Sequence, residues 1–163
     1  MSKPKTKEGT GRGPMDAALR FLGSRARTIR EVERHLDACQ YGEVEVYDVV
    51  ERLKDLNLLN DFAFAEDYIK TRLATKPVSR ARLSEQLRAL EIDEEALDRA
   101  LALVDDEQES QSAAQVASKY ARQYASLPEQ ERTELVLRRL LSRGYGYGEA
   151  RAALKAALEE PEE

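Results

Sequence analysis

The side chains most often used for catalysis and metal binding are scarce in this sequence. It holds one histidine, His35, and one cysteine, Cys39, so it offers neither a histidine pair for a metal helix nor a choice of partners for a Ser-His-Asp triad. We expect His35 to be a packed or half-exposed helix residue and Cys39 to lie in the core or at its boundary. The sequence therefore indicates a protein that is not an enzyme and has no cofactor or metal.

A glycine-rich segment, Gly144-Tyr145-Gly146-Tyr147-Gly148, resembles a phosphate-binding loop only in its glycines. No Lys-Ser or Lys-Thr follows it and no strand is expected before it. We therefore predict a turn that ends a helix, with Gly144 just past the last helical residue. Stacking of nucleic-acid bases on the two tyrosines is the less favoured alternative.

Arginine is the charged residue type whose distribution is informative. The net charge is −5, from 26 basic and 31 acidic residues, which excludes a uniformly basic surface for nucleic acid. Arginines nevertheless gather at the same place in three successive segments, whereas acidic residues gather elsewhere. Alternating charge for solubility is the competing explanation. We predict a basic edge that contacts a partner through Arg25, Arg27, Arg30, Arg72, Arg80, Arg82, Arg138, Arg139 and Arg143.

Composition and length favour an all-helical protein. Of its 163 residues 35% are charged, only 6% are aromatic and none is tryptophan. The longest apolar run, residues 100–104, is far shorter than a membrane-spanning helix, and the single cysteine fits a reducing compartment, so we expect a cytoplasmic location and no membrane contact. Residues 1–14 are basic and nearly devoid of apolar side chains, so we expect a disordered basic tail there.

An internal repeat organises the rest of the chain. One apolar helical stripe at 46, 49, 50 and 53 recurs 51 residues later and again after a further 53, and the helix before it repeats in the same frames. A large corner residue joins the two helices each time, at Tyr41, Ile92 and Tyr145. With one further helix at the start of each unit, we predict three tandem three-helix repeats, over 15–60, 61–104 and 105–160. They are expected to form an elongated, curved array.

Local signals place the ends of these helices. The first helices are expected over 16–25, 62–74 and 111–124. Capping boxes are predicted at Thr28 and at Ser126, and Asp93 is expected to cap the third helix of the second unit. The alternation of Glu and Val over 43–46 mimics a strand, but the repeat frame favours a helix there.

The segment Leu58-Leu59-Asn60-Asp61-Phe62-Ala63-Phe64-Ala65-Glu66-Asp67-Tyr68-Ile69-Lys70-Thr71-Arg72 resembles the signature of the RecX family of bacterial recombination regulators. Asn60 and Asp61 are suited to cap a helix with Phe64, Tyr68 and Ile69 on its inner face. The resemblance covers about residues 15 to 160. The family often has a glycine before the corner of the second unit, where this chain has Glu91, and this leaves a different local turn open.

This resemblance implies a regulator without chemistry of its own. Members of the family bind the RecA filament on single-stranded DNA and inhibit its ATPase, strand-exchange and coprotease activities, which modulates recombination, DNA repair and the SOS response. The implied partner is therefore the RecA–DNA filament, bound by a monomer, with direct DNA contact as a weaker expectation. A stand-alone, helix-turn-helix-like nucleic-acid-binding protein and a generic helical scaffold remain as alternatives. Because exposed charges contribute little to stability, we expect alanine substitution of an arginine trio to weaken binding and leave melting nearly unchanged.

Overall fold

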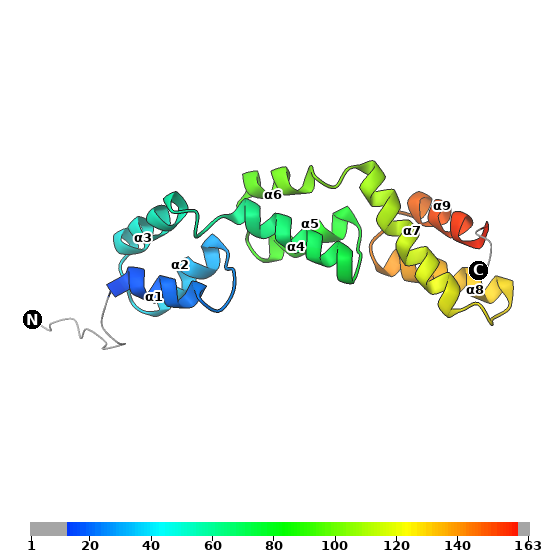
Figure 1. The fold of residues 1–163 in the computed structure, drawn as a ribbon, viewed down its shortest axis with the longest axis horizontal. Helices are drawn as coiled ribbons and strands as arrows, with labels where there is room; N and C mark the ends of the chain where they lie inside the picture. The colour runs from blue at the N-terminus through cyan, green and yellow to red at the C-terminus, as the bar shows by residue number, and fades with distance from the viewer. Residues whose placement is uncertain (1–12, 160–163) are drawn as a thin grey trace, which may run out of the picture. The chain divides into compact units, whose positions relative to one another are not determined.

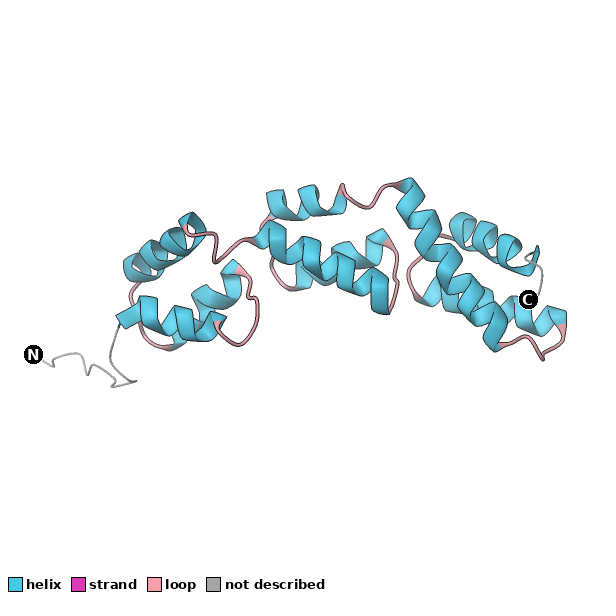
Figure 2. Ribbon diagram, in the orientation of Figure 1, coloured by secondary structure: helices cyan, strands magenta, loops and turns pink. Residues whose placement is uncertain are grey.

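The computed structural model describes residues 13–159, and this part of the chain forms nine α-helices and no strand (Figures 1 and 2). Residues 43–46 are helical, as the repeat frame predicts. The expected tail lies mostly outside the described residues, but Gly13 and Pro14 belong to the first helix. The helices are α1 (Gly13–Leu22), α2 (Ile29–Ala38), α3 (Glu43–Asp55), α4 (Asp61–Thr75), α5 (Arg80–Ala89), α6 (Glu94–Leu101), α7 (Asp106–Gln123), α8 (Glu129–Ser142) and α9 (Tyr147–Glu159).

The chain divides into two compact units after Asn60. In unit 1, α1 packs against α2 and α3. In unit 2, α6 packs against α4 and α5, and α7 packs against α8 and α9. Each set of three helices has its own cluster of buried hydrophobic residues. The all-α class and the tandem three-helix organisation are confirmed, whereas an elongated and curved array stays a prediction.

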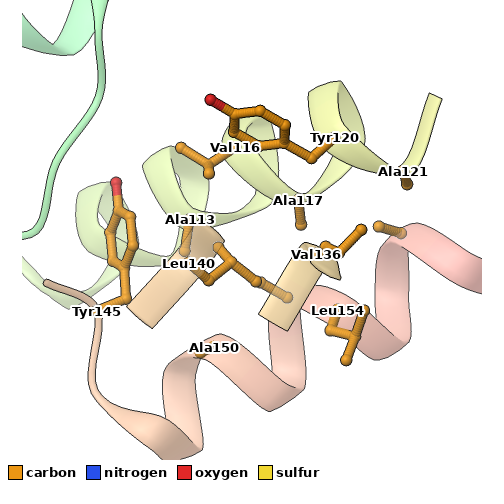
Figure 3. Packing of buried hydrophobic residues seen from close by; sticks show 12 residues of the cluster. Ala113, Val116, Ala117, Tyr120, Ala121, Val136, Leu140, Tyr145, Ala150 and Leu154 are labelled. Atoms are coloured by element: carbon orange, nitrogen blue, oxygen red, sulfur yellow. The ribbon is translucent and has the colours of Figure 1, made fainter. Parts of the chain in front are cut away.

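Corresponding positions fill the three cores. The second helix of each repeat contributes two side chains that are fully buried. The third helix contributes the predicted stripe, except that Val104 of the second repeat is buried just past the end of α6. Figure 3 shows this for α7, α8 and α9, where small alanines of α7 and α9 let the helices approach Val136 and Leu140. The fully buried pairs are Val32 and Leu36, Leu83 and Leu87, and Val136 and Leu140.

The corner between the second and third helices has the same backbone geometry in all three repeats. Gln40, Glu91 and Gly144 adopt positive φ values of 67, 56 and 91°. The N–H of the next residue then donates to a carbonyl in the last turn of the preceding helix: Tyr41 to Leu36, Ile92 to Leu87 and Tyr145 to Leu140, at 3.2, 3.4 and 3.3 Å. These are Schellman motifs, so Glu91 takes the left-handed turn that glycine would otherwise favour.

Capping follows the sequence at some helix starts and not at others. Thr28 Oγ1 accepts from the Glu31 N–H at 3.1 Å, and Asp93 caps α6, as predicted. The prediction of a capping box at Ser126 is wrong, because α8 begins at Glu129 and the residue before it, Pro128, has no side-chain acceptor. Helix α7 also begins earlier than expected, because Asp105 caps it by accepting from the Gln108 N–H at 2.8 Å.

The signature segment forms α4 and fastens it to its neighbours. The first residue of the helix, Asp61, is buried, and its carboxylate accepts from the Asp93 N–H at 3.0 Å, which ties α4 to the start of α6. The Arg99 guanidinium lies 4.3 Å from the centroid of the Phe62 ring. Tyr68 donates to Gln86 Oε1 of α5 at 2.9 Å. The signature segment therefore supplies side chains that connect α4 to α5 and α6 within the second repeat.

Tyr145 fills its corner as predicted and is 2% exposed. Its hydroxyl lies 2.8 Å from Ser112 Oγ of α7. Burial raises the pKa of Tyr145 to about 12, and the hydrogen bond with Ser112 offsets only part of this rise. Base stacking on Tyr145 is thus excluded by its position in the core, while Tyr147 is exposed.

We expect Gly144→Ala to destabilise unit 2 by about 1–3 kcal/mol. The positive φ disfavours any side chain, and a Cβ atom would lie 2.5 Å from Ser79 Oγ and 3.1 Å from Arg82 Cβ. Gln40→Gly is the matched control: it relieves the same left-handed strain and should stabilise unit 1 by about 0.5–1 kcal/mol. Urea unfolding measures both. Equal midpoints for the parent and Gly144→Ala would contradict the assignment.

Tyr145→Phe should lower the stability of unit 2 by about 1 kcal/mol at neutral pH, because the hydrogen bond with Ser112 is lost. Above pH 10 the unfolded tyrosine ionises, whereas folded Tyr145 keeps its proton until about pH 12. The free energy of unfolding of the parent therefore falls as the pH rises from 10 to 12. Tyr145→Phe has no hydroxyl to ionise at this position, so it does not show this fall. Urea unfolding should show the stability advantage of the parent disappearing and then reversing between pH 10 and 12, because the pKa difference outweighs one hydrogen bond. A constant difference would count against a buried, protonated Tyr145.

Candidate functional site

The predicted arginines of unit 1 differ in their surroundings. Arg25 and Arg27 both bind Glu31 Oε2, at 3.0 and 3.5 Å. Arg25 is exposed, but the Arg27 side chain is only 17% exposed, and its guanidinium lies 4.0 Å from the centroid of the Phe21 ring. Arg30 lines a groove between α2 and α3. Arg25 is therefore an exposed member of an ion pair and Arg30 is half-buried at the groove, whereas Arg27 is chiefly part of the fold.

The single histidine lies in the last turn of α2, and the single cysteine follows the end of that helix. His35 is half-buried and stacks on Phe21 with ring centroids 4.1 Å apart, as expected for a packed helix residue. The prediction for Cys39 is wrong: the thiol is exposed, with Sγ 3.9 Å from His35 Nε2. Cys39 is in register with the stripe of Val32 and Leu36, but it is the C-cap residue that follows Ala38, and its thiol stays exposed where the helix ends.

In unit 2 the structure uses Arg80 to join the second and third repeats. Its guanidinium donates to the Val104 carbonyl at 2.7 Å and to Asp106 Oδ1 at 3.2 Å, while its backbone N–H donates to Glu109 Oε2 at 2.8 Å. Burial raises the pKa of the Glu109 carboxyl, and the contacts with Arg80 offset only part of this. Arg80 thereby holds the loop before α7 and the first turns of that helix.

Arg143 makes the reciprocal connection from the third repeat. It donates to the Pro77 carbonyl at 2.8 Å and to the Tyr120 hydroxyl at 2.9 Å, and its own carbonyl accepts from the Ser79 N–H at 3.0 Å. Arg82 adds a bond to the Ser142 carbonyl at 3.3 Å. The loop before α5 is thus attached to the corner between α8 and α9.

Tyr120 is the centre of a cluster of cations in the third repeat. Lys119, Arg139 and Arg143 lie 5.5, 5.1 and 5.8 Å from its ring centroid. Burial raises the pKa of Tyr120, but the hydrogen bond from Arg143 and the nearby positive charges more than offset this, so its pKa lies below the ordinary value. Arg139 also donates to the Tyr124 hydroxyl at 3.2 Å. Sequence reasoning missed Tyr120, although its position on the buried stripe of α7 was a signal for a packing role.

The nine arginines therefore do not form one uniform contact surface. Arg80, Arg82 and Arg143 gather at the connection between the two repeats of unit 2, and Arg72 is half-buried in α4 with no hydrogen-bond partner at Nε. Arg138 is exposed on α8. The expectation that every arginine trio can be replaced without loss of stability needs correction at Arg80 and Arg143.

A groove in unit 1 was missed by the sequence analysis. It has a volume of about 640 Å³ and lies between α2 and α3. Two large apolar side chains beside it are exposed, Val44 by 73% and Tyr47 by 66%. The alternation of Glu and Val at the start of α3 was the available signal, because Val44 lies off the buried stripe. The groove is lined by valines, Ile29 and Tyr47 together with six charged side chains.

The described residues lack the features of two other classes of site. Within residues 13–159, no three acidic, histidine or cysteine side chains come together in a group suited to a metal ion. Over the same range none of the helices has the length and apolar character needed to cross a membrane. The candidate contact regions are the exposed arginines of each unit and, in unit 1, the groove between α2 and α3.

We expect Arg143→Ala to destabilise unit 2 by about 1–3 kcal/mol, because it leaves the Pro77 carbonyl and the Tyr120 hydroxyl without their donor. Arg138→Ala, on the same helix end but exposed, is the matched control and should change stability by no more than about 0.5 kcal/mol. Urea unfolding followed by circular dichroism measures both. Equal losses in the two variants would show that Arg143 does not connect the repeats.

Comparison with known proteins agrees with this architecture. The sequence matches the family models for the first three-helix domain of RecX, over residues 15–53, and for the second, over residues 60–101. The crystal structure of RecX from Lactobacillus salivarius is similar, with a TM-score of 0.77 and 26% identity over 88% of this chain and 94% of that one.

Curated relatives extend the match along the chain. The regulatory protein RecX of Streptomyces coelicolor is 28% identical, over 91% of this chain and 81% of the relative. The regulatory protein RecX of Amycolatopsis mediterranei is 32% identical, over 86% of this chain and 80% of the relative. These relatives are named as regulators and not for a reaction that they catalyse. The matched domains, the shared fold and this extent of identity show that the chain belongs to the RecX family of regulatory proteins.

Proposed function

We propose that this protein binds the RecA filament on single-stranded DNA and inhibits RecA ATP hydrolysis, strand exchange and coprotease activity. It would thereby modulate recombination, DNA repair and the SOS response. The observation that carries the proposal is membership of the RecX family, with the signature segment folded into α4 and fastened through Asp61 to the rest of its repeat. The action is that of a binding protein and needs no chemistry from its side chains.

Exposed cations support binding to an acidic protein surface or to DNA phosphates. Arg25 of unit 1 is exposed. In unit 2, Arg138 and Arg139 are neighbouring exposed residues of α8, and Arg139 donates to the Tyr124 hydroxyl. Contacts that are spread over several repeats gain from multivalency when the partner is itself a repeating filament. Charge attraction speeds association and weakens as salt rises. We propose that the protein acts as a cytoplasmic monomer on several protomers of such a filament.

We expect the purified protein to slow ATP hydrolysis by RecA on single-stranded DNA at less than one molecule per RecA protomer, because one repeat protein contacts more than one protomer. The assay uses RecA from the same organism and a steady-state ATPase measurement. An unchanged rate at saturating protein contradicts the proposal.

The double variant Arg25→Ala/Arg138→Ala tests in the same assay whether exposed arginines contribute to inhibition. Both side chains are exposed, so stability should be retained while more protein is needed for half-inhibition. Its inhibition should also depend less steeply on salt, because fewer ion contacts remain. Inhibition equal to that of the parent at every salt concentration would remove these arginines from the contact surface.

A further inference from the structure

The groove of unit 1 combines an apolar wall with an acidic rim. Val46 and Val50 of α3 line it from the core side, and Val44 and Tyr47 extend the apolar surface outward. Val44 and Tyr47 are three residues apart on a helix, so their side chains are neighbours on one face. Large apolar side chains exposed by 73% and 66% beside a recess are typical of a site that a partner covers.

The repeat frame shows that the scaffold does not require these apolar residues. The equivalent positions of the second repeat hold Glu95 and Asp98, and those of the third hold Gly148 and Arg151. All four are exposed, as their positions predict. Only the first repeat has large apolar side chains at both places. The three-helix fold therefore does not need apolar residues at these two positions, and Val44 and Tyr47 belong to the surface of the first repeat alone.

The charges around the groove define what it can bind. Four carboxylates line it, Glu33, Asp37, Glu43 and Glu51, against two cations, Arg30 and Lys54. Within this set Lys54 Nζ lies 3.1 Å from Glu51 Oε1, so these two charges compensate each other. The rim therefore has a surplus of negative charge. A partner with positive charge on both sides of an apolar side chain would complement both the wall and the rim.

We propose that the groove between α2 and α3 binds a segment of the RecA protomer in which an apolar side chain is flanked by lysine or arginine. This inference rests on the proposed function and assigns part of the contact to a surface other than the basic edge. The apolar side chain packs on Val44 and Tyr47, since buried tyrosines commonly dominate binding energy. The flanking cations lie against Glu33 and Asp37 and set the register of the segment.

The first test removes the apolar wall without changing charge. Val44→Ala/Tyr47→Ala should weaken binding to RecA filaments on single-stranded DNA at least tenfold, measured by fluorescence anisotropy of the labelled protein. The urea midpoint should stay close to that of the parent, because both side chains are largely exposed and alanine favours helix. Glu95→Ala/Asp98→Ala, at the equivalent positions of the second repeat, should leave binding within about twofold.

The second test probes the charged rim directly. Carbodiimide treatment of the complex joins a carboxylate to a lysine amine as an amide with loss of water, so it reports carboxylates that lie against lysines. We expect links from Glu33, Asp37 or Glu43 to a RecA lysine that is next to an apolar residue. Glu33→Gln/Asp37→Asn should reduce these links and make binding less sensitive to salt.

The outcomes separate this inference from the proposed function. If the parent binds the filament and Val44→Ala/Tyr47→Ala binds it equally well, the groove assignment is overturned and the proposed function stands. No filament binding by the parent overturns both. Sedimentation that shows a dimer of the free chain, abolished by Val44→Ala/Tyr47→Ala, assigns the groove to a second copy and also overturns the inference.

Discussion

The left-handed residue that ends the second helix of each repeat is the constraint on which the rest of the structure depends. At Gln40, Glu91 and Gly144 the chain leaves the helix with positive φ, and the next residue turns back over the last turn. A large side chain then enters the core, as Ile92 and Tyr145 do with 5% and 2% exposure. This corner sets the direction of the third helix and hence the surface against which the first helix packs.

The second and third repeats have separate cores, and polar contacts connect them within unit 2. Between the second and third repeats these contacts come mainly from arginines that pair with backbone carbonyls, including Val104, Pro77 and Ser142. A guanidinium suits this role because it has several donors in a fixed plane and a long aliphatic stem. Gly144 completes the connection, since only a residue without a Cβ leaves room for Ser79 Oγ.

A surface made of repeated units lets one fold present different chemistry at equivalent places. Position 47 and its counterparts, 98 and 151, hold tyrosine, aspartate and arginine, and all three side chains are exposed. The helices beneath them are the same because the core positions are the same. A regulator of this kind can therefore vary its contact surface from repeat to repeat while its cores stay constant.

Much of the fold could be predicted from the sequence because its determinants are local. Helical periodicity, the spacing of 51 and 53 residues, and the caps at Thr28 and Asp93 all act over a few turns of chain. The same reasoning failed at Ser126, because α8 begins only after Pro128, and at Cys39, because the helix ends before that residue and leaves the thiol exposed. Both failures come from boundaries that shift by a few residues.

The sequence by itself determined the fold class, the three corners and the family resemblance, since each depends on residues close together in the chain. Only the tertiary structure decided what individual arginines do. Arg143, at the end of α8, reaches Pro77, and Arg82 of α5 reaches Ser142, both across long stretches of sequence. Arg138, in the last turns of α8, stays exposed. A long, flexible side chain takes its partner from whatever the fold brings near it, and spacing in the sequence does not encode that proximity.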